Sequence, residues 1–205
     1  MDTTRKPSDH PEMLKSTGDM EANVKTHSIT VAEFDRMVEA GVYGRDDRIE
    51  LIDGRLIDVP PQGPPHFGTL TRFQHRFLTA FGRRAQVRGQ GPLPVGLDSQ
   101  PEPDLALVRW NDRFYGDAHP TVEETYAVVE IAYTSQQFDR GVKRRIYGAG
   151  GIPEYWIVDL EADTIEVYRD PHDLGYTSPA VFTRGESVAF AAFPDVVFAV
   201  DELLD

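Results

Sequence analysis

Residues 126–133 of this chain read YAVVEIAY, and this almost unbroken apolar run decides the fold class. A strand with one face in water alternates apolar and polar residues, whereas a continuous apolar run is typical of a strand covered on both faces. The run therefore predicts a central strand with structure packed on each side. Its one acidic residue, Glu130, is costly to bury unless it is paired or binds a cation.

The segments on either side of this run alternate between helix and strand patterns. Apolar residues at spacings of three and four predict a helix over 67–81. Asp-Gly at 53–54 predicts a two-residue turn, and Thr30 with Glu33 forms a capping box before an early helix. Further expected elements are a hairpin over 48–59, a strand over 104–108, a helix over 139–149, strands over 155–160 and 164–169, and weaker peripheral strands toward the C-terminus. This mixture predicts a mixed α/β (α+β) fold.

Length and composition indicate one globular domain with a polar N-terminal arm. The chain has 205 residues, of which 40% are hydrophobic and 27% charged, as in globular proteins. Residues 1–27 carry almost no large apolar side chains, so we expect a disordered arm followed by one domain over 28–205. No stretch approaches the roughly 18 apolar residues of a membrane span, and no signal peptide is recognisable. We therefore expect a soluble, cytoplasmic protein without a membrane partner.

Charge and cysteine content exclude several classes of function. The 21 Lys and Arg against 34 Asp and Glu give a net charge of −13, which argues against coating nucleic acid by bulk charge. The absence of cysteine excludes disulfides, iron–sulfur clusters and thiol catalysis. No HxH, HExxH, GxSxG, Walker or GxGxxG pattern occurs, so zinc hydrolysis, serine catalysis and nucleotide binding find no support. We expect His66, just before the predicted helix, to cap that helix or line a cleft.

A second acidic residue, Asp104, opens another short apolar strand. Two carboxylates on separate strands that face one cleft repel each other, so one pKa rises unless a divalent cation neutralises both. Oxygen-only ligands suit Mg²⁺, with Mn²⁺ as a substitute, rather than zinc. For Glu130 alone the alternatives are a structural ion pair or a strand-end carboxylate in water.

Two further residues are candidates for the same cleft. Lys143 follows Asp139 by four residues, which fits a surface ion pair worth a few tenths of a kcal/mol. The functional alternative has the Lys143 ammonium in the cleft, where it orients a water or stabilises a phosphate transition state. Glu50, within the predicted hairpin, is by itself expected to face solvent.

A local excess of positive charge interrupts the acidic chain. No acidic residue occurs between Val59 and Leu97, and this stretch contains Arg72, Arg76, Arg83, Arg84 and Arg88. Arg72, Arg76 and Arg83 lie opposite the apolar stripe of the predicted helix. They are candidates to guide a phosphate backbone; a solvated helix face is the alternative.

Several motifs resemble, in their order along the chain, those of the Uma2 family of endonucleases, also called DUF820. They are ELIDG at 50–54, PEPD at 101–104, VEI at 129–131, DRGVK at 139–143, Tyr147, and GIPEYWIVD at 151–159. The resemblance covers the chain from about Ser28 to the C-terminus. It implies a restriction-endonuclease-like fold, in which a central mixed sheet flanked by helices carries a PD-(D/E)xK type active site.

The resemblance also implies roles for individual residues. Asp104 corresponds to the aspartate of the PD motif and Glu130 to the second acid, and together with the backbone carbonyl of Ile131 they would hold Mg²⁺. Lys143 corresponds to the lysine of the motif, placed on the following helix. Glu50 corresponds to an acidic residue from the N-terminal segment that binds a second metal or orients its water shell.

The function expected from this resemblance is metal-dependent hydrolysis of DNA phosphodiester bonds by an endonuclease. Two alternatives stay open. One is a protein that keeps the nuclease fold and binds metal or DNA without cutting, and the other is an enzyme that hydrolyses a smaller phosphoester. A homodimer would supply the two sites that cutting both DNA strands requires.

Overall fold

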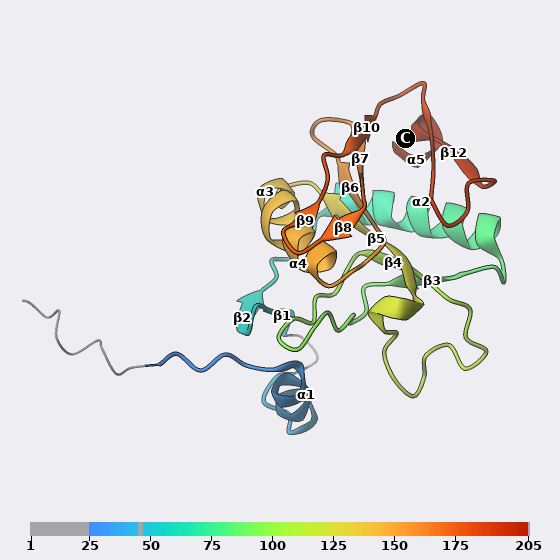
Figure 1. The fold of residues 1–205 in the computed structure, drawn as a ribbon. Helices are drawn as coiled ribbons and strands as arrows, with labels where there is room; N and C mark the ends of the chain where they lie inside the picture. Colours follow the sequence, from blue (N-terminus) through green and yellow to red (C-terminus); the bar gives the residue numbers. More distant parts are fainter. Residues whose placement is uncertain (1–24, 45–46, 205) are drawn as a thin grey trace, which may run out of the picture.

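Six strands form a central sheet in the computed structural model, which describes residues 25–44 and 47–204 (Figure 1). In spatial order they are β10 (Ala180–Phe182), β7 (Thr164–Arg169), β6 (Glu154–Asp159), β5 (Thr125–Ala132), β4 (Leu105–Val108) and β3 (Gln86–Gly89). β5 and β6 pair in parallel, and every other neighbouring pair is antiparallel. The predicted mixed sheet is confirmed, with the apolar run as one of its two innermost strands.

Helices and short strand pairs surround this sheet. The helices are α1 (Val31–Glu39), α2 (Pro64–Phe81), α3 (Gln136–Phe138), α4 (Arg144–Ala149) and α5 (Val200–Leu204), with a 3₁₀ turn η3 (Val122–Glu124) and a π-helical turn η4 (Asp139–Lys143). The strand pairs are β1 (Ile49–Ile52) with β2 (Arg55–Asp58), β8 (Pro171–His172) with β9 (Gly175–Tyr176), and β11 (Ser187–Ala189) with β12 (Val197–Ala199). In Figure 1, α2 lies on one side of the sheet and α3 and α4 lie on the other.

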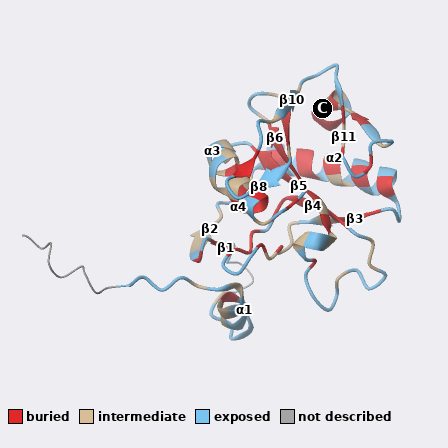
Figure 2. Ribbon diagram, in the orientation of Figure 1, coloured by how far each residue is buried: buried red, intermediate tan, exposed pale blue. Residues whose placement is uncertain are grey.

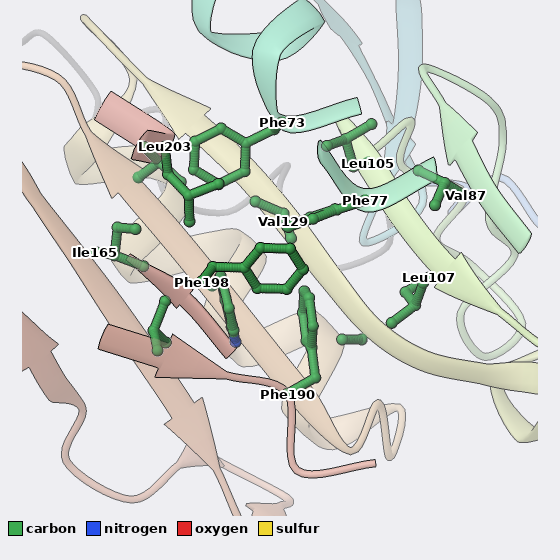
Figure 3. Close-up of a cluster of buried hydrophobic side chains, with 14 of the residues drawn as sticks. Phe73, Phe77, Val87, Leu105, Leu107, Val129, Ile165, Phe190, Phe198 and Leu203 are labelled. Atoms are coloured by element: carbon green, nitrogen blue, oxygen red, sulfur yellow. The ribbon is translucent and has the colours of Figure 1, made fainter. Parts of the chain in front are cut away.

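Helix α2 and the C-terminal segment cover one face of the sheet. The buried stripe of α2 contributes Phe73, Phe77 and Phe81, and the Phe77 ring lies 5.0 Å from that of Phe198 in β12. Figure 3 shows Phe73, Phe77 and Phe198 around Val129 of β5. The expectation of peripheral C-terminal strands is wrong in this respect, because the segment supplies part of the main core and ends in a helix that the sequence patterns did not indicate.

The other face carries α3, η4, α4 and the β8–β9 pair. Alternation along β5 sends Val129 and Ile131 into the α2 core, and Val128 and Ala132 into a second apolar cluster on the opposite face. Glu130 shares this second face. Figure 2 shows the central strands buried, whereas α1 is largely exposed. The continuous apolar run is therefore explained by burial on both faces.

The local turn and capping signals are confirmed. Thr30 caps α1, and its capping box with Glu33 is complete. Asp53 and Gly54 connect β1 to β2 with φ of 49° and 68°, the left-handed values that a tight hairpin turn of this type requires. Strand β1 is attached to the body of the fold through Gln100, whose backbone N–H donates to the Leu51 carbonyl at 2.7 Å.

A close approach between α4 and β9 gives a first prediction. A Cβ atom at Gly148 would lie 2.1 Å from the Gly175 carbonyl oxygen. We expect Gly148→Ala to lower the free energy of unfolding by about 1–3 kcal/mol, as in other overpacked sites, although alanine is the better helix former. Gly68→Ala is the control, since Gly68 is exposed in α2 with nothing within 4 Å of its Cβ position. Urea denaturation measures both variants, and equal effects would contradict the prediction.

Two expectations concern the ends of the chain and the membrane. Of the arm expected over 1–27, residues 1–24 lie outside the described residues, and 25–27 form neither helix nor strand. Within the described part of the chain, no helix has the length and apolar character needed to cross a membrane.

Candidate active site

Strand pairing brings Asp104 and Glu130 together. In the antiparallel ladder of β4 and β5, Leu105 pairs with Val129, so the residue before Leu105 lies opposite the residue after Val129. The Asp104 amide is 3.4 Å from Glu130 Oε2. Both carboxylates are buried, at 4% and 3% exposure. Two acids far apart in the sequence thus share one buried position at the end of the β4–β5 pair.

Lys143 and Glu50 reach the same position from two other elements, η4 and β1. Lys143, in η4, places its Nζ 2.9 Å from Glu130 Oε1 and 3.5 Å from Glu50 Oε1. Glu50 is only 4% exposed, so the expectation that it faces solvent is wrong. Burial of Asp139 and Lys143 also excludes a surface ion pair at this spacing. The reason in both cases is that the β1–β2 hairpin and η4 pack over the end of β5.

Asp104 is held mainly by one of its two oxygens. Its Oδ2 accepts from the Ile131 amide at 2.9 Å and lies 2.9 Å from His66 Nε2. Among the described residues, its Oδ1 has two long contacts, both 3.4 Å, with the side-chain amides of Gln62 and Gln90. His66 lies in the first turn of α2 rather than before it, and it lines the cleft.

Several polar residues of the site were not identified from the sequence. Tyr147 donates to Glu130 Oε1 at 2.8 Å, and Ser135 donates to Asp139 at 2.6 Å. His66, by contrast, was expected to cap the helix or line a cleft, and it lines the cleft. It precedes Leu70 and Phe73 by four and seven residues and so continues the buried stripe of α2. Tyr147 stands among apolar residues, where nothing distinguishes it locally from a core aromatic residue.

The protonation of these groups follows from burial and neighbouring charges. Burial raises the pKa of Glu130 to about 8, helped by the Asp104, Asp139 and Glu50 carboxylates and opposed by the Lys143 ammonium. Burial also acts to raise the pKa of Asp104, but the His66 hydrogen bond and the Ile131 amide outweigh it, and that pKa is lowered. The surrounding carboxylates, Glu130 foremost, raise the pKa of Lys143 despite its desolvation.

These groups line a cleft of about 470 Å³. Its floor holds Glu50, Asp104, Glu130 and Lys143. Its remaining walls come from the β1–β2 hairpin, the loop before α2, and the segment after β5; they include Arg48, Ile57, Pro60, Gln62, Tyr133 and Phe138. Ile131 also lines the cleft. A polar floor with mostly apolar and neutral walls is typical of a ligand site.

The donor set is suited to a hard divalent cation. Among the described residues, no group of three or more His, Asp or Glu side chains is spaced to hold a metal ion. Mg²⁺ needs fewer, because it keeps several waters and is bound by one or two carboxylates. Asp104 Oδ1 and Glu130 Oε2 are the oxygens with only 3.4 Å contacts, and they belong to carboxylates that repel each other. This pair therefore fits a magnesium or manganese ion.

The raised pKa of Glu130 gives a prediction for the metal-free protein. Its pKa rises from 4.5 to about 8 on folding, so the folded state binds the proton more tightly and stability is lost as the pH rises between these values. Glu130→Gln removes this loss. We expect its melting temperature in chelator to match or exceed that of the wild type, with an advantage that grows from pH 5 to 8.

Calorimetric melting of both proteins across this pH range is the measurement. A variant that melts far below the wild type at every pH would show that Glu130 serves chiefly as the partner of Lys143, and the metal assignment would weaken.

Arg72 and Arg76 lie in α2, whereas Arg83 follows the end of this helix at Phe81, and none of the three candidate arginines lines the cleft. Each makes a contact on the surface instead: Arg72 with the Leu203 carbonyl at 3.4 Å, Arg76 with Glu202 at 3.2 Å, and Arg83 with Asp112 at 2.6 Å. Arg76 and Arg83 thus have carboxylate partners from distant segments, which the sequence could not reveal. A role in guiding a phosphate backbone stays a prediction.

Comparisons with known proteins identify a family for this chain and a solved structure of similar fold. Residues 31–201 match the Uma2 family, described as "Putative restriction endonuclease". A solved structure of similar fold is a "putative nuclease belonging to DUF820" from Anabaena variabilis ATCC 29413, at 19% identity and a TM-score of 0.65 over 86% of this chain and 97% of that one. No match was found among curated proteins. Because the family match spans most of its length, the chain belongs to the Uma2 family, a membership that supports a nuclease.

Proposed function

We propose that this protein is a Mg²⁺-dependent endonuclease that hydrolyses DNA phosphodiester bonds. The observation that carries the proposal is the buried grouping of Asp104, Glu130 and Lys143 at the floor of a cleft. Two carboxylates and one lysine from separate elements have no structural need to converge there, since apolar residues would fill the same space at lower cost. Family membership points to the same class of chemistry.

Asp104 and Glu130 would hold the ion, with the carbonyl of Ile131 as a further ligand. A bound Mg²⁺ supplies Lewis acidity toward a phosphate oxygen and lowers the pKa of a water molecule. Asp104 is suited to this because its lowered pKa keeps it ionised at neutral pH. Glu130 must give up its proton when it becomes a ligand, so metal binding and proton release are coupled.

Lys143 acts as a fixed positive charge. Its raised pKa keeps it protonated, so it is not a general base. In the metal-free protein its ammonium offsets the Glu130 and Glu50 carboxylates, and beside a phosphate it stabilises the charge that develops in the transition state. Glu50, across the cleft floor, would orient water or bind a second ion.

A protein that keeps the nuclease fold and binds metal or DNA without cutting is the second candidate. Two observations oppose tight, unaided binding of DNA and so weigh against the nuclease. The net charge of −13 opposes close approach of DNA, and carboxylate partners reduce the free positive charge of Arg76 in α2 and of Arg83 just after it. A homodimer and a cytoplasmic location stay predictions.

Nicking of supercoiled plasmid by the purified protein separates the candidates. An endonuclease converts the plasmid to open circles with Mg²⁺ or Mn²⁺ and does not in chelator. DNA retention in a gel-shift assay without conversion would support the binding candidate. Neither conversion nor retention, together with Mn²⁺ binding by calorimetry, would indicate a smaller phosphoester as substrate.

A further inference from the structure

Two buried side chains beside the cleft, His66 and Tyr147, each contact one carboxylate of the candidate metal pair. We propose that they are positioning residues, which hold one oxygen of Asp104 and one of Glu130 so that the second oxygen of each carboxylate is left for a divalent cation. This inference rests on the metal site of the proposed function. It assigns to two residues a role that is separate from holding the ion or touching the substrate.

On the Asp104 side, the contacts divide unequally between the two oxygens. Oδ2 takes the short contacts, with His66 Nε2 and the Ile131 amide at 2.9 Å each. Because an ionised carboxylate only accepts hydrogen bonds, Nε2 is the donor in this contact. The side-chain amides near Oδ1 are both at 3.4 Å. A cation that binds this oxygen would therefore displace only long hydrogen-bond contacts.

On the Glu130 side, the same division recurs. Oε1 accepts from the Tyr147 hydroxyl at 2.8 Å and from Lys143 at 2.9 Å. In the part of the chain that the structure describes, Oε2 has one hydrogen-bond contact, at 3.4 Å, with the Asp104 backbone amide. Each carboxylate therefore has one oxygen held firmly and one held weakly.

A purely structural explanation does not account for the two donors. Buried polar atoms are normally hydrogen-bonded, yet within the described part of the chain His66 Nδ1 is buried without a partner. The ring is thus tied by its polar atoms to Asp104 alone. The Tyr147 hydroxyl likewise has Glu130 as its one hydrogen-bond partner among the described residues. Leucine and phenylalanine would fill these positions without burying a polar atom, so each donor is explained by the carboxylate that it contacts.

Binding of Mn²⁺ by calorimetry tests the proposal. Partners that orient metal ligands typically change metal affinity by about 10–100-fold, and we expect weakening of this order in His66→Leu and in Tyr147→Phe. His66→Gln restores an N–H donor at nearly the same reach and should bind within several-fold of the wild type. Tyr176→Phe is the matched control, because it removes a buried hydroxyl that donates to the Ile152 carbonyl instead.

The outcomes separate positioning from folding and from the proposed function. Positioning is supported if Mn²⁺ affinity falls in His66→Leu and Tyr147→Phe, is restored in His66→Gln and is unchanged in Tyr176→Phe. The melting temperatures of the metal-free variants should not follow the same order. Wild-type affinity in both His66→Leu and Tyr147→Phe overturns it. A wild type that binds Mn²⁺ but never nicks plasmid contradicts the nuclease alone, whereas a wild type that binds no Mn²⁺ overturns the metal site and the positioning role together.

Discussion

Asp104→Ala is expected to abolish metal-dependent nicking of plasmid DNA. The substitution removes the carboxylate whose lowered pKa keeps it ionised and which lies at the cleft floor with Glu130. Loss of a metal ion that supplies several kcal/mol to the transition state corresponds to a rate decrease of about a thousandfold or more. The measurement is the rate of open-circle formation in Mg²⁺ and in Mn²⁺, with Mn²⁺ affinity measured on the same preparations.

Asp112→Ala is the matched control for this variant. It also removes one carboxylate, but from an exposed ion pair with Arg83 outside the cleft, so nicking should be unchanged. Asp104→Asn keeps the size of the side chain and removes its charge, and it should lose activity as Asp104→Ala does. Retention of wild-type nicking by a folded Asp104→Ala protein would exclude Asp104 as a ligand and contradict the mechanism.

Lys143→Met should produce the largest change in the stability of the metal-free protein. Removing one partner of a buried ion pair costs about 3–5 kcal/mol, because the other charge is left uncompensated. Here Glu130 and Glu50 are left, at 2.9 and 3.5 Å from the lost ammonium. Without Lys143 the pKa of Glu130 rises further, so the folded state binds its proton more tightly than the unfolded state. The destabilisation is therefore greatest at high pH and shrinks toward pH 5.

Urea denaturation in chelator at several pH values measures this effect. Lys25→Met is the matched control, since Lys25 is exposed and its loss should change the free energy of unfolding very little. Added Mn²⁺ should stabilise Lys143→Met more than the wild type, because a cation at Asp104 and Glu130 replaces the missing positive charge. A Lys143→Met protein as stable as the wild type at pH 8 would contradict the prediction, because it would show that protonation of the carboxylates is enough to relieve their repulsion.

The carboxylates of the site could be singled out from sequence because they interrupt apolar runs. Glu130 within YAVVEIAY and Asp104 before its strand are anomalous on burial grounds alone. Glu50 stands between Ile49 and Leu51, but a charged residue in a short predicted hairpin normally faces water. Its burial depends on where the β1–β2 hairpin packs, and only the family resemblance suggested it.

The sequence by itself determined the local structure of this protein. Apolar periodicity predicted α2, and the continuous apolar run predicted β5. Turn and capping chemistry predicted the Asp53–Gly54 turn and the start of α1. These features depend on backbone stereochemistry over a few neighbouring residues, so they can be read without knowing the rest of the fold.

Tertiary structure alone decided which distant side chains come into contact. The register of β4 against β5 places Asp104 beside Glu130, and the packing of α2 brings His66 to Asp104. Arg76 forms its ion pair with Glu202 of α5. Such contacts join residues tens of positions apart, and they form because whole buried faces pack together rather than because of any local preference. The charge, hydrogen bonding and pKa of each site residue follow from that packing.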